Sequence, residues 1–395
     1  MLFAGALVLQ LPQVQTGIAD KLVGKLSEKL DGEITFEKIH LKPFTTLVLK
    51  NTLITDRNPV TSPLDSTLEK VDTFFRAEYI IVRFSLEGLL NKESIKIDKA
   101  YVANAQMNLT IEDHPHPTAH EDSYNNLSRI FRLEKPEVKK EYSPKEIFRI
   151  RQVEIKDMGF FMKNMSSNAI DYHGGGIDWN KLDIKDINLY AEDLRFKDGI
   201  MYGSAERLSF RETTGFTVHQ MSGRARVGRG KTVVEDLMIK DQWSDLHLPL
   251  YMMTYDSVES FSDFISLVKL DGQIAPSVLD FRTIVNFAPQ LKGNTLKATV
   301  SGSMSGYVDD FKVKDIRIDS HEGGFKGTVN GRMTGIPETM DMMVDANVTN
   351  LKLTAEGRNN IRDRPCDHLV LGEISVAQHA AVHVCSVADR ADSIF

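Results

Sequence analysis

The sequence is poor in cysteine and tryptophan, and it has no excess of positive charge. Its 395 residues include 2 Cys and 2 Trp. Two cysteines are too few for a disulfide-stapled scaffold or a structural zinc site. The 48 Lys and Arg stand against 55 Asp and Glu, which gives a net charge of −7. This balance argues against nucleic acid as a partner, because phosphate binding needs a cationic face.

Sequence motifs of catalysis are also missing. No GxSxG nucleophile motif occurs, and no phosphate-loop lysine follows Gly174-Gly175-Gly176. His114, His116 and His120 lie in a proline-containing segment without the HExxH helix that positions metal ligands. The sequence therefore predicts a protein that is not an enzyme and that uses neither a cofactor nor a metal.

The overall composition is that of a globular protein. Apolar residues make up 42% and charged residues 26% of the chain, which excludes disorder over its whole length. The length predicts two or three domains, or a single elongated one.

The first residues form an apolar run that is too short to cross a bilayer. Met1–Leu11 is almost wholly apolar, whereas a spanning helix needs about 20 such residues. It is either a membrane anchor that has lost its first half or a short buried element. Pro12 and the polar residues after it are typical of a membrane exit, which favours a truncated anchor over residues 1–12. The anchor residues would be Leu2, Phe3, Leu7, Val8 and Leu9.

Residues 13–31 have the period of an amphipathic helix. Val14, Ile18, Leu22, Leu26 and Leu30 recur at every fourth position, and a glycine follows. Such a helix could pack on a sheet or lie on a membrane surface. The narrow apolar stripe and the few cations favour packing on a sheet.

From residue 32 onward the period changes to two, which is typical of β-strands. The clearest strand covers residues 95–111, where apolar residues take the odd positions and polar residues most of the even ones. This run is longer than a usual strand of about five or six residues. The apolar positions are Ile95, Ile97, Tyr101, Ala103, Ala105, Met107, Leu109 and Ile111.

Residue patterns divide the rest of the chain into three segments. Residues 112–146 predict a loop insertion with a short helix near Tyr124–Arg132, and residues 147–355 predict further strands with a few short helices. Glycine-rich ribbons within residues 296–335 form a weak internal repeat. Residues 356–395 lose the alternation and are either a non-native tail or an irregular loop. Further apolar alternating positions are Leu246, Leu248, Leu250, Val300, Met304, Val329 and Met333.

The order of several segments resembles the start of TamB-type proteins of the AsmA-like superfamily. The segments are Leu7–Asp56, Gly174–Leu194, Arg211–Phe216 and Ser277–Leu291, and the resemblance covers about residues 1–355. It implies an inner-membrane anchor and a periplasmic body of β-strands curled into an open apolar groove, as in bridge-like lipid transfer proteins. Residues 13–111 and 147–355 would build this groove, and the family's C-terminal domain would be missing.

The resemblance implies a fold and two alternative functions. The expected fold is mainly β, an elongated, curled antiparallel sheet with an N-terminal amphipathic helix. The first function is to carry phospholipid between the inner and outer membranes, with the apolar strand positions named above lining the groove. The second is a platform for assembling outer-membrane β-barrels with a partner of the TamA class, through the missing C-terminal region.

Physical reasoning from the residues alone does not decide whether the strands form a groove. A strand with one apolar face must hide it, either against protein in a dry core or against acyl chains. The sequence by itself favours the dry core, and the resemblance favours the groove.

Overall fold

The computed structural model describes most of the chain between residues 30 and 353. The described residues are 30–42, 45–57, 73–85, 94–118, 121–131, 146–166, 176–256, 260–261, 264–287, 289, 292, 296–321, 324–335, 343–353 and 379–384. The expected anchor, nearly all of the helix expected before Gly32 and both cysteines lie outside them. None of the helices in the described part is long and apolar enough to cross a membrane.

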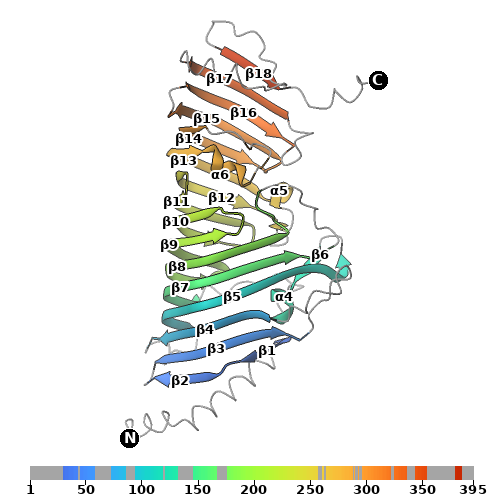
Figure 1. Ribbon diagram of the computed structural model, residues 1–395, viewed down its shortest axis with the longest axis vertical. Helices are drawn as coiled ribbons and strands as arrows, with labels where there is room; N and C mark the ends of the chain where they lie inside the picture. Colours follow the sequence, from blue (N-terminus) through green and yellow to red (C-terminus); the bar gives the residue numbers. More distant parts are fainter. Residues whose placement is uncertain are drawn as a thin grey trace. The chain divides into compact units, whose positions relative to one another are not determined.

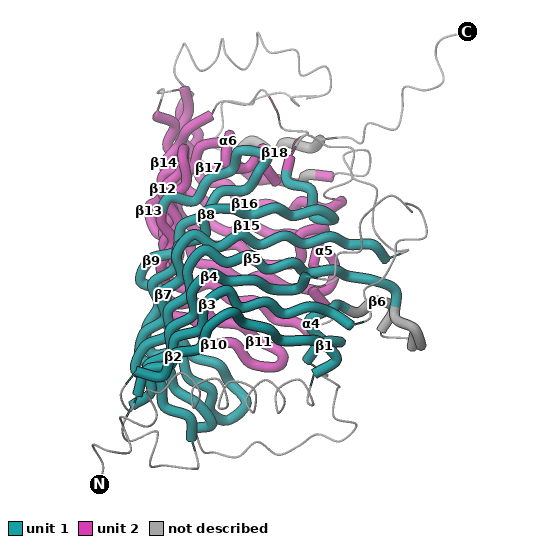
Figure 2. The backbone as a smooth tube through the Cα atoms, turned by 60° about the horizontal axis from the view of Figure 1, so that its bottom comes forward, with its two compact units in different colours: residues 1–173, 177–219 teal, residues 174–176, 220–395 magenta. Residues whose placement is uncertain are grey.

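The described chain is mainly β and forms two compact units (Figures 1 and 2). Unit 1 comprises residues 1–173 and 177–219, and unit 2 comprises residues 174–176 and 220–395. The division falls within strand β10 (Thr217–Val227).

Unit 1 is an open, curled sheet whose neighbouring strands run in the order β3, β4, β5, β7, β8 and β9. β1 and β2 share the outer edge of β3, and β6 pairs with the far end of β5. The bounds are β1 Gly32–Thr35, β2 Lys38–Lys42, β3 Thr46–Asp56, β4 Thr73–Phe84, β5 Ile95–Thr118, β6 Glu121–Asn125, α4 Asn126–Ile130, β7 Glu146–Asn164, β8 Lys181–Lys197 and β9 Ile200–Glu212.

The sheet of unit 1 is mixed, so the expectation of an antiparallel sheet is wrong for one pair of strands. β5 and β7 pair in parallel from Ile95↔Phe148 to Ile111↔Asn164. A parallel pair needs a long crossover, because the chain must return to the same end of the sheet. The segment between β5 and β7 supplies this length. Residues 112–146 are expected to be a loop, but their described part contains the end of β5, all of β6 and the expected short helix, α4.

Unit 2 continues with strands that pair antiparallel with the next strand in sequence from β11 to β18. Short turns join β11 to β12, β14 to β15 and β15 to β16, which is the simplest connection for antiparallel strands, whereas α5 and α6 lie between β12 and β13 and between β13 and β14. The bounds are β11 Lys231–Asp241, β12 Asp245–Thr254, α5 Phe264–Leu267, β13 Lys269–Asp280, α6 Phe281–Val285, β14 Lys297–Gly306, β15 Asp310–Ser320, β16 Phe325–Thr334, β17 Met343–Leu353 and β18 His379–Val384.

Helix α4 closes one end of unit 1 with a buried ion cluster. Arg129 is bonded to Asp56 of β3 and to Glu112 of β5, and the three side chains are nearly inaccessible to solvent. Asn126 accepts the Thr110 N–H at 3.0 Å through its Oδ1. The helix therefore joins strands that are not neighbours, and burial raises the pKa of the Glu112 carboxyl despite the nearby guanidinium.

In unit 2 a second buried polar cluster joins the turn between β11 and β12 to helix α6. Asp241 accepts the Ser244 N–H at 2.6 Å and the Thr283 hydroxyl at 2.7 Å. Asp280 caps α6 by accepting the Arg282 N–H at 3.0 Å. The Arg282 guanidinium, bonded to the same carboxylate, lowers the pKa of Asp280.

Candidate functional site

A row of bends crosses the middle of unit 1. Asn51, Asn104 and Asp157 have φ near +50°, a left-handed conformation that asparagine and aspartate tolerate better than other residues with a Cβ. The three lie at the same level of the sheet, because the residues just before and just after them are paired with one another from β3 through β4 and β5 to β7. Glu78 of β4 occupies that position between Asn51 and Asn104. We call Asn51, Glu78, Asn104 and Asp157 the bend row.

On one side of the bend row the two faces of the sheet differ sharply. Tyr101 lies on a polar face. The centre of its ring is 5.9 Å from the Nζ atoms of both Lys99 and Lys156. Glu154, paired with Tyr101, receives a 2.6 Å bond from Lys99, and this bond lowers the pKa of Glu154. Side chains alternate along a strand, so Ala100 and Val102 point to the opposite face.

That opposite face is aliphatic across six strands. Residues paired in register share a face, so each row can be followed from β3 to β9. Every side chain in both rows is half-buried. One row is Leu49, Ile80, Val102, Ile155, Leu189 and Leu208, and the other is Leu47, Val82, Ala100, Val153, Ala191 and Ala205.

Beyond the bend row the apolar face continues with larger side chains. Met107 pairs with Phe75 and Phe160, and Leu109 pairs with Met162. All of these side chains are half-buried too. The apolar face of unit 1 is therefore defined by the two aliphatic rows together with Ile54, Phe75, Met107, Phe160, Ile184, Leu109, Met162 and Leu182.

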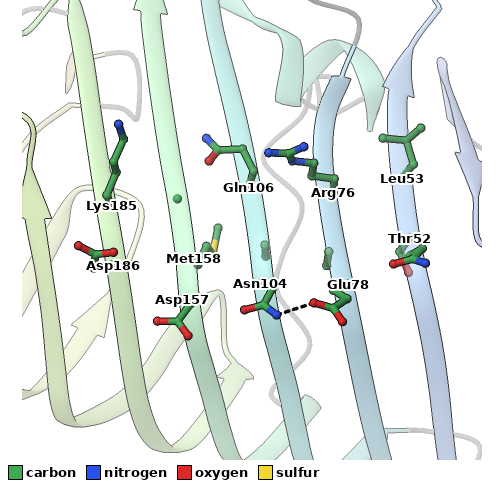
Figure 3. A pocket seen from close by; sticks show the side chains of 14 residues that line it. Thr52, Leu53, Arg76, Glu78, Asn104, Gln106, Asp157, Met158, Lys185 and Asp186 are labelled. Carbon is green, nitrogen blue, oxygen red and sulfur yellow. Dashed lines mark hydrogen bonds between the residues drawn. The ribbon is translucent and has the colours of Figure 1, made fainter.

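The opposite, polar face is hollowed where the strands bend. Figure 3 shows Arg76, Glu78, Asn104, Gln106 and Asp157 projecting on this side. The hollow has a volume of about 630 Å³. Its lining carries both signs of charge and amide groups, as expected for a hydrated surface. Gly159 leaves room for the Gln106 side chain, which a Cβ at that position would overlap.

The residues predicted on β5 do not share one face. The alternation changes phase at Asn104, so Tyr101 lies on the polar face whereas Met107 and Leu109 belong to the apolar face. Ala103 and Ala105, on either side of the bend, are both buried. Ile95 is 57% exposed. Ile97 pairs with Phe84 and Ile150, and Ile111 pairs with Asn164 and Asn125, at the two ends of this strand region.

The predicted apolar positions in unit 2 also lie in different surroundings. Leu248 is buried near Gly272, where Tyr251 and Met304 also approach, and burial raises the pKa of Tyr251. Leu250 instead lines a hollow of 270 Å³ with polar neighbours such as Gln273. The remaining positions lie in strand pairs, namely Leu246 with Ile239, Val300 with Ile318, Val329 with Ile316 and Met333 with Phe311.

Sequence reasoning missed most of the apolar face. Ala100 and Val102 fall at even positions of a strand whose apolar side was assigned to odd positions. A usable signal does exist in the sequence. It is a four-residue pattern: an apolar residue, any residue, an Asn or Asp, and then another apolar or small residue. Examples are Ile155–Met158, Ile184–Ile187, Val234–Leu237 and Val313–Ile316, and each contains an aspartate with positive φ.

Two sequence features that could suggest metal or phosphate binding are tested by the described part of the chain. This part contains no group of three or more His, Cys, Asp or Glu side chains placed to hold a metal ion. The segment Gly228–Thr232, which has the Gly-Lys-Thr ending of a phosphate loop, joins β10 to β11. The Gly228 N–H donates to the Lys231 carbonyl at 2.9 Å in this turn. Strand β11 follows, so the segment does not lead into the helix N-terminus that a phosphate loop requires.

Comparisons with protein-family models, with curated proteins and with solved structures find no match to this chain. The resemblance to TamB-type proteins therefore remains an expectation drawn from the sequence.

Proposed function

We propose that the apolar face of unit 1 holds the acyl chains of phospholipid. The supporting observation is that two register rows of aliphatic side chains cross six strands and stay half-buried along their length. The setting that we propose is an inner-membrane-anchored protein with its body in the periplasm, which carries phospholipid between the two membranes. This setting rests on the sequence resemblance.

The degree of burial favours acyl chains over a dry protein core as the covering of this face. In a sheet sandwich the inward side chains interdigitate with a second layer and become almost fully buried. Here Val102, Ile155 and Leu189 keep partial exposure in the middle of the sheet. A continuous, partly exposed apolar surface of this kind is typical of a binding site. Burial of one lipid methylene contributes about 0.8 kcal/mol, so a single tail would bind such a surface strongly.

The proposal is tested by purifying the chain in mild detergent and extracting it for lipid mass spectrometry. We expect phospholipid in stoichiometric amount. A well-folded chain without lipid would contradict the proposal, since the face would then be covered by protein.

Neighbouring isoleucines on β4 provide a matched pair of variants. Ile80 lies on the apolar face, whereas Ile81 pairs with Tyr101 on the polar face, and both are half-buried. Ile80→Asp should reduce bound phospholipid by about tenfold or more, because a carboxylate is costly against hydrocarbon. Ile81→Asp should leave lipid content near the original level. Equal loss in both variants, or unfolding of Ile80→Asp alone, would indicate a packing role for Ile80.

A further inference from the structure

At each bend, the residues that form the apolar face change from even to odd positions in the sequence, or from odd to even. On β5 it uses even residues up to Val102 and odd residues from Met107 onward. On β7 it uses odd residues up to Ile155 and even residues from Phe160 onward. β3 changes phase at Asn51, from Leu47 and Leu49 to Ile54. β4 changes phase at Glu78, between Phe75 and Ile80, although Glu78 does not have a positive φ.

The same change occurs on β8, at Asp186. The face uses Leu182 and Ile184 before the bend and Leu189 and Ala191 after it. Here the bend is a β-bulge, because two residues of β8 between Ile184 and Ile187 lie opposite Gly159 alone. An extra residue in one strand shifts the alternation by one position.

We infer that the left-handed Asn and Asp residues at the bends are phase switches that keep the apolar side chains of unit 1 on a single face. If β7 lost its switch at Asp157, every side chain beyond it would turn to the opposite face. Phe160 and Met162 would then point to the polar side. The continuity of the lipid-binding face thus depends on residues that do not touch lipid; this consequence rests on the proposed function.

Hydrogen bonds across the strands hold the switches in place. The Asp157 N–H donates to the Asn188 Oδ1 at 3.3 Å, and the Asn188 amide donates to the Asp186 carbonyl at 2.9 Å. The Asn104 amide bonds Glu78 of the bend row (Figure 3). A side chain on the neighbouring strand thus satisfies a backbone group that the bend removes from the regular ladder.

Unit 2 contains the same device. Asp315 has φ of 51°, and its N–H donates to the Asn330 Oδ1 at 2.8 Å. The face of β15 changes from Phe311 and Val313 to Ile316 and Ile318 at this point. A left-handed aspartate at a change of phase therefore occurs in both units.

The test replaces Asp157 and reads the face of β7 directly. In a background with Cys366→Ser and Cys385→Ser, single cysteines are placed at Met162 and at Lys163, and their rates of reaction with a water-soluble maleimide are measured. A valine at position 157 disfavours the left-handed conformation because it is β-branched. Asp157→Val should raise the labelling rate at position 162 and lower it at position 163, each by about fivefold or more.

Matched variants keep the test decisive. Asp157→Gly and Asp157→Asn retain access to positive φ and should preserve the original labelling pattern. If Asp157→Val fails to fold, Asp157→Ala replaces it and should give a mixture of both patterns. An unchanged pattern in a folded Val or Ala variant would overturn the inference.

Lipid content, measured in parallel, separates this inference from the proposed function. Loss of phospholipid together with the exchanged labelling pattern supports both. An exchanged pattern in a chain that never carried lipid would leave the phase switch standing and refute the lipid proposal.

Discussion

Replacement of Arg129 by methionine should lower the stability of unit 1 by about 3–5 kcal/mol, the usual cost of removing one partner from a buried ion cluster. The variant would keep two buried carboxylates, Asp56 and Glu112, and remove the guanidinium that lies between them. Because Arg129 lies on α4 and its partners on β3 and β5, the loss should appear where these elements meet. Hydrogen exchange of peptides from β3 and β5 measures it.

The pH dependence of this loss identifies its cause. An acid whose pKa is raised in the folded state contributes stability below its unfolded pKa, and the contribution is lost as the pH rises through the folded pKa. Burial raises the pKa of Glu112, and removal of Arg129 should raise it further. The Arg129→Met penalty should therefore be largest at neutral pH and shrink as the pH falls through the Glu112 pKa. A penalty independent of pH would indicate lost packing instead.

A compensated variant provides the control for this prediction. Arg129→Met combined with Asp56→Asn and Glu112→Gln removes the uncompensated charge and should recover most of the lost stability. Failure to recover would show that the guanidinium acts through its packing and geometry.

The second large effect is expected at Asp241 in unit 2. Its carboxylate accepts the Trp243 and Ser244 N–H groups at 2.6 Å each, and the Thr283 hydroxyl at 2.7 Å. Asp241→Ala would leave several buried donors without this acceptor, at about 1–3 kcal/mol for each group that stays unsatisfied. We expect a loss of about 3 kcal/mol, measured by urea unfolding followed through Trp243 fluorescence in a Trp179→Phe background.

Two comparisons test the reason for that loss. Asp241→Asn keeps an oxygen for the backbone donors and can donate its amide to the Thr283 hydroxyl, so its loss should be much smaller. Asp319, paired with Lys326 at 2.6 Å on the surface, should be replaceable by alanine with little effect. Equal destabilisation by Asp241→Ala and Asp241→Asn would contradict the hydrogen-bond explanation.

The signal for the bends is present in the sequence, although the alternation of one strand is not enough to read it. In Ile155-Lys156-Asp157-Met158 the apolar residues are three apart, which breaks a period of two. Taken alone, this spacing also fits a turn of helix. Recognition of a bend requires the same spacing at matching positions of neighbouring strands, and those positions are known only once the strands are paired.

By itself the sequence determined that the chain is mainly β and placed its longest strand, because alternation of apolar and polar residues is a local property of an extended backbone. The tertiary structure decided the parallel pairing of β5 with β7, the phase changes at Asn51, Asn104 and Asp157, and the side chains that form the apolar face. These features depend on the register between strands. Register is set by contacts between residues that are far apart in the chain, so no local pattern can supply it.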